Sequence, residues 1–277
     1  MFPVLLELGP LTISSYGVSK ALAALVAGWL LARELRRVGR EPDLAWTLAV
    51  IGLIAGFLGA KVYYLAENAG SLTAMDFGTM GFTWHGGLLG GALGVAVVAR
   101  RNGLPLRLLA GLIPVPLSVA YGVGRLGCLL AGDGTYGTPS TVPWAMSFPN
   151  GTMPTLERVH PAPLYEALAA FAIAAALWQV RTRLRPAVMF GAYAVLSGLA
   201  RLLVEMVRTN EPVVAGLTQP QLWSIALIAF GVGLLIYSGR RAIGKHLGVR
   251  AAPVTTARVK GRVHLHTLIA SASARTR

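Results

Sequence analysis

The chain has 277 residues, of which 55% are hydrophobic and only 13% are charged, and its mean hydropathy is +0.61. This leaves too little polar surface for a soluble globule, which excludes a soluble enzyme or binding domain and predicts a protein embedded in lipid. The net charge of +14 does not indicate a nucleic-acid partner, because the basic residues fall in short clusters between apolar runs and after Gly239.

Seven apolar runs qualify as transmembrane helices, since a helix needs roughly 20 residues to cross the bilayer core, and fewer where it is short or flanked by anchoring residues. They lie at 16–31, 44–65, 82–98, 106–123, 164–180, 187–207 and 222–237. No Lys or Arg precedes Lys20, so the first run lacks the basic start of a cleavable signal peptide and is expected to stay as an anchor. We predict an all-α polytopic membrane protein with about seven transmembrane helices.

The basic residues predict the orientation of these helices, because cytoplasmic segments of membrane proteins are enriched in Lys and Arg. If every second connection is cytoplasmic, those connections and the C-terminal tail contain 19 of the 25 basic residues. The N-terminus is therefore expected outside and the C-terminus in the cytoplasm.

Four parts follow from this organisation. Residues 1–123 contain the first four helices, 124–163 a glycine-rich segment and a small external head, 164–239 the last three helices, and 240–277 a basic cytoplasmic tail that is expected to be disordered. The head is expected to be ordered because it contains Trp144, Phe148 and Met153. We find no inverted internal repeat of the kind that many secondary transporters contain.

The third run begins with Trp84 and His85, followed by four glycines in six positions that allow a neighbouring helix to approach closely. A single intramembrane histidine is usually a structural hydrogen-bonding residue. The ordinary pKa of histidine also makes His85 a candidate proton acceptor.

Residues 124–137 contain five glycines and Arg125 at the expected end of the fourth helix. Glycine lets the backbone come close to a ligand, and the guanidinium of Arg125 can hold a phosphate with two hydrogen bonds. A helix end capped by glycine explains the same pattern equally well.

The fifth run opens with His160 and two prolines, which are placed to start a helix. His160 and Glu166 are expected to be interfacial scaffold rather than catalytic residues. A zinc site is not expected, because no second His or Cys at a metal-ligand spacing accompanies them.

The sixth run carries Arg201, Glu205 and Arg208, spaced so that all three share one helix face. A charge at membrane depth costs several kcal/mol, so each needs a partner or a function. For Glu205, a structural ion pair and a functional role explain the position equally well. With only one carboxylate expected beside the two arginines, positive charge remains, and this suits a phosphate.

In this order the motifs resemble the prolipoprotein diacylglyceryl transferase family of bacterial inner membranes. The resemblance extends from Gly9 to about Gly233 and rests on five segments: Ser-Tyr-Gly at 15–17, His-Gly-Gly at 85–87, the Gly-Arg signature at 124–137, His-Pro at 160–161 with Leu-Tyr-Glu at 164–166, and Arg201, Val204, Glu205 and Arg208. It implies seven transmembrane helices, an external head, and transfer of diacylglyceryl from phosphatidylglycerol to the lipobox cysteine of a prolipoprotein signal peptide.

The resemblance also implies roles for individual residues. The essential tyrosine of the family falls on Tyr16, the signature arginine on Arg125 and the closing glycine on Gly137. Its later arginine and glutamate fall on Arg201 and Glu205.

The signature departs from the family pattern at two positions. Cys128 stands where an Asn is expected and Asp133 where a Glu is expected. Asp keeps the charge, whereas Cys removes an amide donor and acceptor.

The resulting hypothesis is an enzyme that forms a thioether by displacing glycerol 1-phosphate from phosphatidylglycerol with a cysteine thiolate. Arg125 and Arg201 would hold the phosphate, His85 would be the base, and Tyr16 and Asp133 would orient lipid or water. The other substrate-binding candidates are Cys128, Gly137, Glu205 and Arg208, and no metal or cofactor is needed. Two alternatives remain open: a divergent relative with another acceptor or no activity, and a small lipid or solute transporter.

Overall fold

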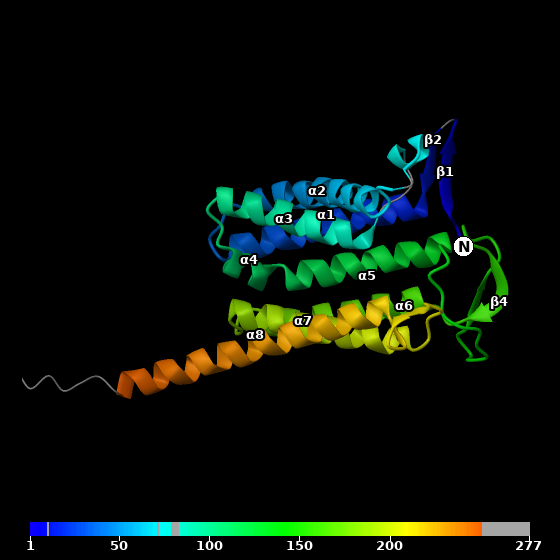
Figure 1. The fold of residues 1–277 in the computed structure, drawn as a ribbon. Coiled ribbons are helices and arrows are strands. Elements are labelled where there is room, and N and C mark those ends of the chain that lie inside the picture. Colours follow the sequence, from blue (N-terminus) through cyan, green and yellow to red (C-terminus); the bar gives the residue numbers. More distant parts are fainter. Residues whose placement is uncertain (10, 71, 79–82, 251–277) are drawn as a thin grey trace, which may run out of the picture. The chain divides into compact units, whose positions relative to one another are not determined.

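The computed structural model describes residues 1–9, 11–70, 72–78 and 83–250 (Figure 1). Met1–Gly239 form one unit, and the chain from Arg240 onward is a second unit. Of the tail predicted at 240–277, the first residues continue the last helix, α8 (Gln219–Arg250), and residues 251–277 lie outside the described part.

Seven helices of 18 residues or more occur in the described part of the chain. Besides α8 they are α1 (Ser15–Arg37), α2 (Leu44–Glu67), α3 (Trp84–Arg101), α5 (Pro114–Ala131), α6 (Ala162–Val180) and α7 (Pro186–Glu205). Six of them are long and apolar enough to cross a membrane; α3 matches α5 in length but contains His85, Arg100 and Arg101, which lower its hydropathy. The predicted all-α polytopic membrane fold is confirmed.

The fourth apolar run does not form a single helix. It is divided into the short helix α4 (Leu106–Leu112) and α5, which begins at Pro114, a residue that can start a helix but lacks the N–H to continue one. The end of α5 is at Ala131, where Gly132 adopts a left-handed conformation with a φ of 62°. Residues 124–131 are therefore the last turns of α5, beyond the expected helix end at Val123.

Three short antiparallel hairpins were not predicted. They are β1 (Val4–Leu8) with β2 (Leu11–Ser14), β3 (Met146–Phe148) with β4 (Thr155–Val159), and β5 (Pro212–Val214) with β6 (Leu217–Thr218), and a 3-10 turn, η1 (Ala74–Phe77), follows α2.

The segment between α5 and α6 folds around its own small core. Phe148 is fully buried, and its ring stacks on that of Tyr136 with 3.9 Å between the ring centres. The backbone N–H of Phe2 donates to the carbonyl of Leu130 over 3.1 Å, which ties the N-terminus to the end of α5. This segment is therefore packed around Phe148 and joined to the N-terminus.

The helices alternate in direction, as expected from the basic clusters. The starts of α1, α6 and α8 and the ends of α5 and α7 lie beside the hairpins, whereas the arginine-rich ends of α1 and α3 lie at the opposite end of the bundle (Figure 1). Which end faces the cytoplasm remains a prediction from charge.

Glycines allow two of the helix contacts to be very close. A Cβ on Gly59 of α2 would lie 2.8 Å from the Cα of Gly90 of α3, so the two backbones touch. A Cβ on Gly127 of α5 would lie 2.7 Å from the hydroxyl of Ser19 of α1. Small residues are typical of helix contacts within membranes.

Candidate functional site

Charged side chains from α5, α6 and α7 meet inside the bundle near the head. Arg125 comes from α5, Glu166 from α6, Arg201 and Glu205 from α7, and Arg208 from the turn after α7. We call these five residues the arginine cluster. Both carboxylates are buried, at 3% exposure for Glu166 and 4% for Glu205. Charges with so little access to water are stable only when paired.

Glu166 is the centre of the cluster. Its Oε2 lies 2.5 Å from Nε of Arg125, and its Oε1 accepts a hydrogen bond from Arg201. Nη1 of Arg208 lies 3.9 Å from the same Oε1. One carboxylate therefore neutralises guanidinium groups from two helices and a loop, and so joins α5, α6 and α7.

Glu205 holds the other side of the cluster. Its Oε2 lies 2.8 Å from Nη2 of Arg201, one turn earlier on α7. Its Oε1 accepts hydrogen bonds over 2.7 Å from the side chains of Asn210 and Thr218. Thr218 immediately precedes α8, so this carboxylate also fixes the start of the last helix.

The charges in the cluster do not cancel. Three arginines face two carboxylates, which leaves a net charge of about +1. The sequence expectation of a single carboxylate is wrong, because Glu166 approaches from α6. Nε of Arg208 is buried 3.9 Å from Oε2 of Glu205 and forms no hydrogen bond in the described structure, so one guanidinium donor of the cluster is not satisfied.

Arg208 connects the cluster to the glycine-rich segment. Its Nη1 donates to the carbonyl of Thr135 over 3.0 Å, and its backbone pairs with that of Gly137. A Cβ on Gly137 would lie 2.7 Å from the Cβ of His160, so only glycine fits there. Burial lowers the pKa of Arg208, although the charge of Glu166 opposes this shift.

Arg125 and Cys128 lie one helical turn apart on α5. Nε of Arg125 donates to the hydroxyl of Tyr121 over 3.1 Å, and its Nη1 lies 4.0 Å from the sulfur of Cys128. Cys128 is only 4% exposed. The position that departs from the family pattern therefore adjoins the arginine that is expected to bind phosphate.

Asp133 forms a tight turn just after α5. Its Oδ1 accepts hydrogen bonds from the backbone N–H and the hydroxyl of Thr135, over 3.1 and 2.6 Å. Because the carbonyl of Thr135 accepts from Arg208, Asp133 supports the cluster through the backbone.

His85 and Tyr16 lie on other helices than the arginines. The ring centre of His85 is 5.1 Å from that of Trp223 on α8 and 6.3 Å from that of Tyr63 on α2. Tyr16, near the start of α1, is 43% exposed, and Nζ of Lys20 lies 4.7 Å above its ring. A Cβ on Gly124 would lie 3.3 Å from the same Nζ, so Lys20 points toward the turn of α5 that carries Arg125.

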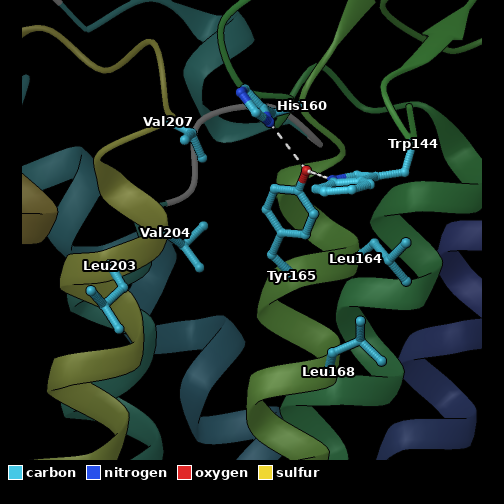
Figure 2. Close-up of a pocket in the computed structure, with 8 residues that line it drawn as sticks. All are labelled: Trp144, His160, Leu164, Tyr165, Leu168, Leu203, Val204 and Val207. Atoms are coloured by element: carbon cyan, nitrogen blue, oxygen red, sulfur yellow. Dashed lines mark hydrogen bonds between the residues drawn. The ribbon is translucent and has the colours of Figure 1, made fainter. Parts of the chain in front are cut away.

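A cavity of about 640 Å³ opens between α6 and α7, the helices that also carry Glu166, Arg201 and Glu205 (Figure 2). One end is polar: the hydroxyl of Tyr165 accepts from Nε1 of Trp144 over 2.7 Å and lies 3.1 Å from Nδ1 of His160. The remaining wall is aliphatic and consists of Leu164, Leu168, Leu203, Val204 and Val207. Such a cavity suits an apolar chain with a polar end group.

Sequence reasoning missed the role of Glu166. The sequence did contain an indication of this role. Glu166 is the fifth residue of an apolar helix, and burying its carboxylate costs as much free energy as burying that of Glu205. Tyr121 was also missed, and nothing in its sequence context distinguishes it from other interfacial tyrosines.

Comparison with known proteins gives a consistent result. Residues 3–237 match the family described as Prolipoprotein diacylglyceryl transferase. A phosphatidylglycerol–prolipoprotein diacylglyceryl transferase of Methylocella silvestris is 34% identical, over 86% of this chain and 94% of its own length. Proteins of the same name from Clostridium tetani and Synechococcus elongatus are 30% and 32% identical, over 84% and 87% of this chain and 96% and 89% of their own lengths.

Proposed function

Because the chain belongs to the prolipoprotein diacylglyceryl transferase family, we infer that it transfers the sn-1,2-diacylglyceryl group of phosphatidylglycerol to the lipobox cysteine of prolipoproteins. The sulfur forms a bond to the glyceryl carbon while the bond from that carbon to the phosphate oxygen breaks. The products are a thioether and glycerol 1-phosphate. Family membership favours this reaction over the transporter alternative.

The observation that carries the proposal for the site is the incompletely neutralised arginine cluster. A phosphodiester carries one negative charge, which matches the net charge of about +1 in the cluster. The leaving phosphate monoester gains negative charge as the bond breaks. Fixed guanidinium groups in a medium of low dielectric constant stabilise that gain more strongly than they stabilise the substrate, which is the requirement for catalysis.

Within this site, Arg125, Arg201 and Arg208 bind the phosphate, and Glu166 and Glu205 hold their guanidinium groups in place. Each carboxylate contacts at least two of the arginines, so it restricts the movement of these otherwise flexible side chains. Such prior positioning lowers the barrier because no reorganisation is needed during the reaction.

The thiol must lose its proton to react, and His85 is the proposed base. Tyr16 and Asp133 are proposed to orient the lipid, the first from α1 and the second through its turn with Thr135. The cavity of Figure 2 is proposed to take an acyl chain, because its aliphatic wall lies on α6 and α7, the helices that also carry Glu166 and Arg201.

The apolar helices and the family together place the chain in a membrane, which it crosses several times. We assign it to the bacterial cytoplasmic membrane with the head on the outer face. The basic connections support this orientation, and signal peptides of exported prolipoproteins become available at that face.

The decisive experiment incubates the purified full-length protein with phosphatidylglycerol and a lipobox peptide and measures both glycerol phosphate and the peptide mass. Equimolar release of glycerol phosphate and a diacylglyceryl mass on the peptide cysteine are expected. Glycerol phosphate release without peptide modification would indicate another acceptor, and neither product would indicate an inactive relative.

A further inference from the structure

A second cationic site lies at the end of α1 that points away from the head. A cavity of about 260 Å³ is lined there by Trp29, Ala32, Arg33 and Arg36. At 1.5 Å per helical residue, Arg33 lies roughly 30 Å along α1 from its start beside the head. The cavity is therefore separate from the arginine cluster.

The carboxylate closest to this cavity is already paired. Glu34 is 2% exposed, and its two oxygens lie 2.5 Å from Nη2 of Arg37 and 2.9 Å from Nε of Arg181. This pairing ties the end of α1 to the end of α6. Arg33 and Arg36 form no ion pair with any residue that the structure describes, so their charges remain available.

Aromatic rings hold the free guanidinium at this site. The guanidinium carbon of Arg33 lies 5.9 Å from the ring centre of Trp29 and 5.2 Å from that of Trp178. The guanidinium of Arg181 stacks on Trp178 at 3.4 Å. Such contacts restrict the arginine side chains and so reduce the entropy lost when they bind an anion.

The position of the site favours a lipid over a soluble anion. Trp29 is 55% exposed and lies eight residues before the end of the membrane-spanning helix α1, and tryptophan is typically enriched near the headgroup level. The four arginines and the single glutamate around the cavity give a net charge of about +3, and anionic lipids gather at such clusters.

We propose that Arg33 and Arg36 bind the phosphate of an anionic phospholipid, whose glycerol and upper acyl carbons pack on Trp29. This lipid is bound and not consumed, because the site lies at the other end of the bundle from the transferase residues. It links the lipid composition of that leaflet to the ion pairs of Glu34, which join the ends of α1 and α6.

The test measures lipid binding to the purified full-length protein by native mass spectrometry. Phosphatidylserine is the anionic probe, and phosphatidylcholine is the zwitterionic comparison. The variant Arg33→Gln/Arg36→Gln is compared with Arg100→Gln/Arg101→Gln, which removes the same charge from exposed positions at the end of α3. The single variant Arg36→Gln tests the site again with a smaller change.

In the wild type and the α3 variant, one phosphatidylserine should bind with an affinity that the α1 double variant lowers by roughly tenfold or more. Arg36→Gln should show a smaller loss, and all variants should keep transferase activity. Equal losses of phosphatidylserine affinity in both double variants would overturn the proposal, because binding would then depend on overall surface charge and not on this site. Equal binding of phosphatidylcholine, no loss in the α1 variant, or displacement by millimolar inorganic phosphate would each overturn the proposal.

Discussion

The variant Glu166→Gln should show whether Glu166 positions the arginines for the reaction or only stabilises the folded protein. Glu166→Gln keeps the shape of the side chain but removes the charge that pairs with Arg125 and Arg201. The amide nitrogen would then face a guanidinium, and the net charge of the cluster would rise from about +1 to about +2. Removing one member of a buried ion pair costs about 3–5 kcal/mol of stability.

The effect on the reaction rate is separate from this loss of folding stability. We expect kcat to fall about a hundredfold, equivalent to about 3 kcal/mol, because misplaced guanidinium groups no longer match the developing phosphate charge. KM for phosphatidylglycerol should change less, since the added positive charge still attracts the phosphodiester. Glu166→Asp should recover part of the rate, because it restores the charge one methylene short.

The assay is glycerol phosphate release at several concentrations of phosphatidylglycerol, normalised to folded protein. Glu34→Gln is the matched control, because Glu34 is similarly buried and also pairs with two arginines, but at the opposite end of the bundle. Both variants should melt at lower temperature, and only Glu166→Gln should lose kcat. Equal losses of kcat in the two variants, or a near-normal kcat in Glu166→Gln, would refute the positioning role.

The other predictions concern phosphate binding, the unusual cysteine and the orientation. Arg125→Ala and Arg201→Ala should each lower the rate by on the order of a hundredfold while the protein still inserts. Lys at either position should restore only part of the rate, because its ammonium group cannot form two parallel hydrogen bonds. Near-normal rates in both Ala variants would contradict the proposed phosphate-binding role. Cys128→Asn should preserve or raise the rate and Cys128→Ala should lower it modestly, whereas loss of turnover in both together with a lipid adduct on wild-type Cys128 would indicate a covalent intermediate. Leu156 is 85% exposed on the head. In a Cys128→Ala background, the variant Leu156→Cys should react with an impermeant maleimide in intact cells. Labelling only after permeabilisation would mean that the orientation is the reverse of the predicted one.

Hydropathy and charge were sufficient to predict most of the long helices and their alternating direction, but not the division of the fourth apolar run. Both signals are averages over many residues, so a few atypical positions do not hide them. The break between α4 and α5 depends on Pro114, which lies inside a run that remains apolar on both sides. The hairpins were missed because strands of five residues or fewer are too short for a periodic pattern to emerge.

The site could be predicted only residue by residue, not as an arrangement. Arg201, Glu205 and Arg208 were grouped correctly because their contacts are local in sequence, although Arg208 lies in the turn after α7 and not on the helix as expected. The pairing of Glu166 with Arg125 joins two helices, and spacing along the sequence carries no information about such a contact. The motif that contains Glu166 was visible, but its partner was not.

The arginine cluster also has consequences for how the chain enters the membrane. A helix that inserts alone must carry its charges into lipid, at about 2.5–3.5 kcal/mol for a central Arg or Asp. The helix α7 brings Arg201 and Glu205 as an internal ion pair, whereas Arg125 on α5 and Glu166 on α6 each have no oppositely charged partner on their own helix. The charges of Arg125 and Glu166 neutralise each other when α5 and α6 lie side by side as an antiparallel pair. We therefore expect these two helices to enter the bilayer together, joined by the head segment on the outer side. Residues that are proposed to bind phosphate would then also direct this step of membrane insertion.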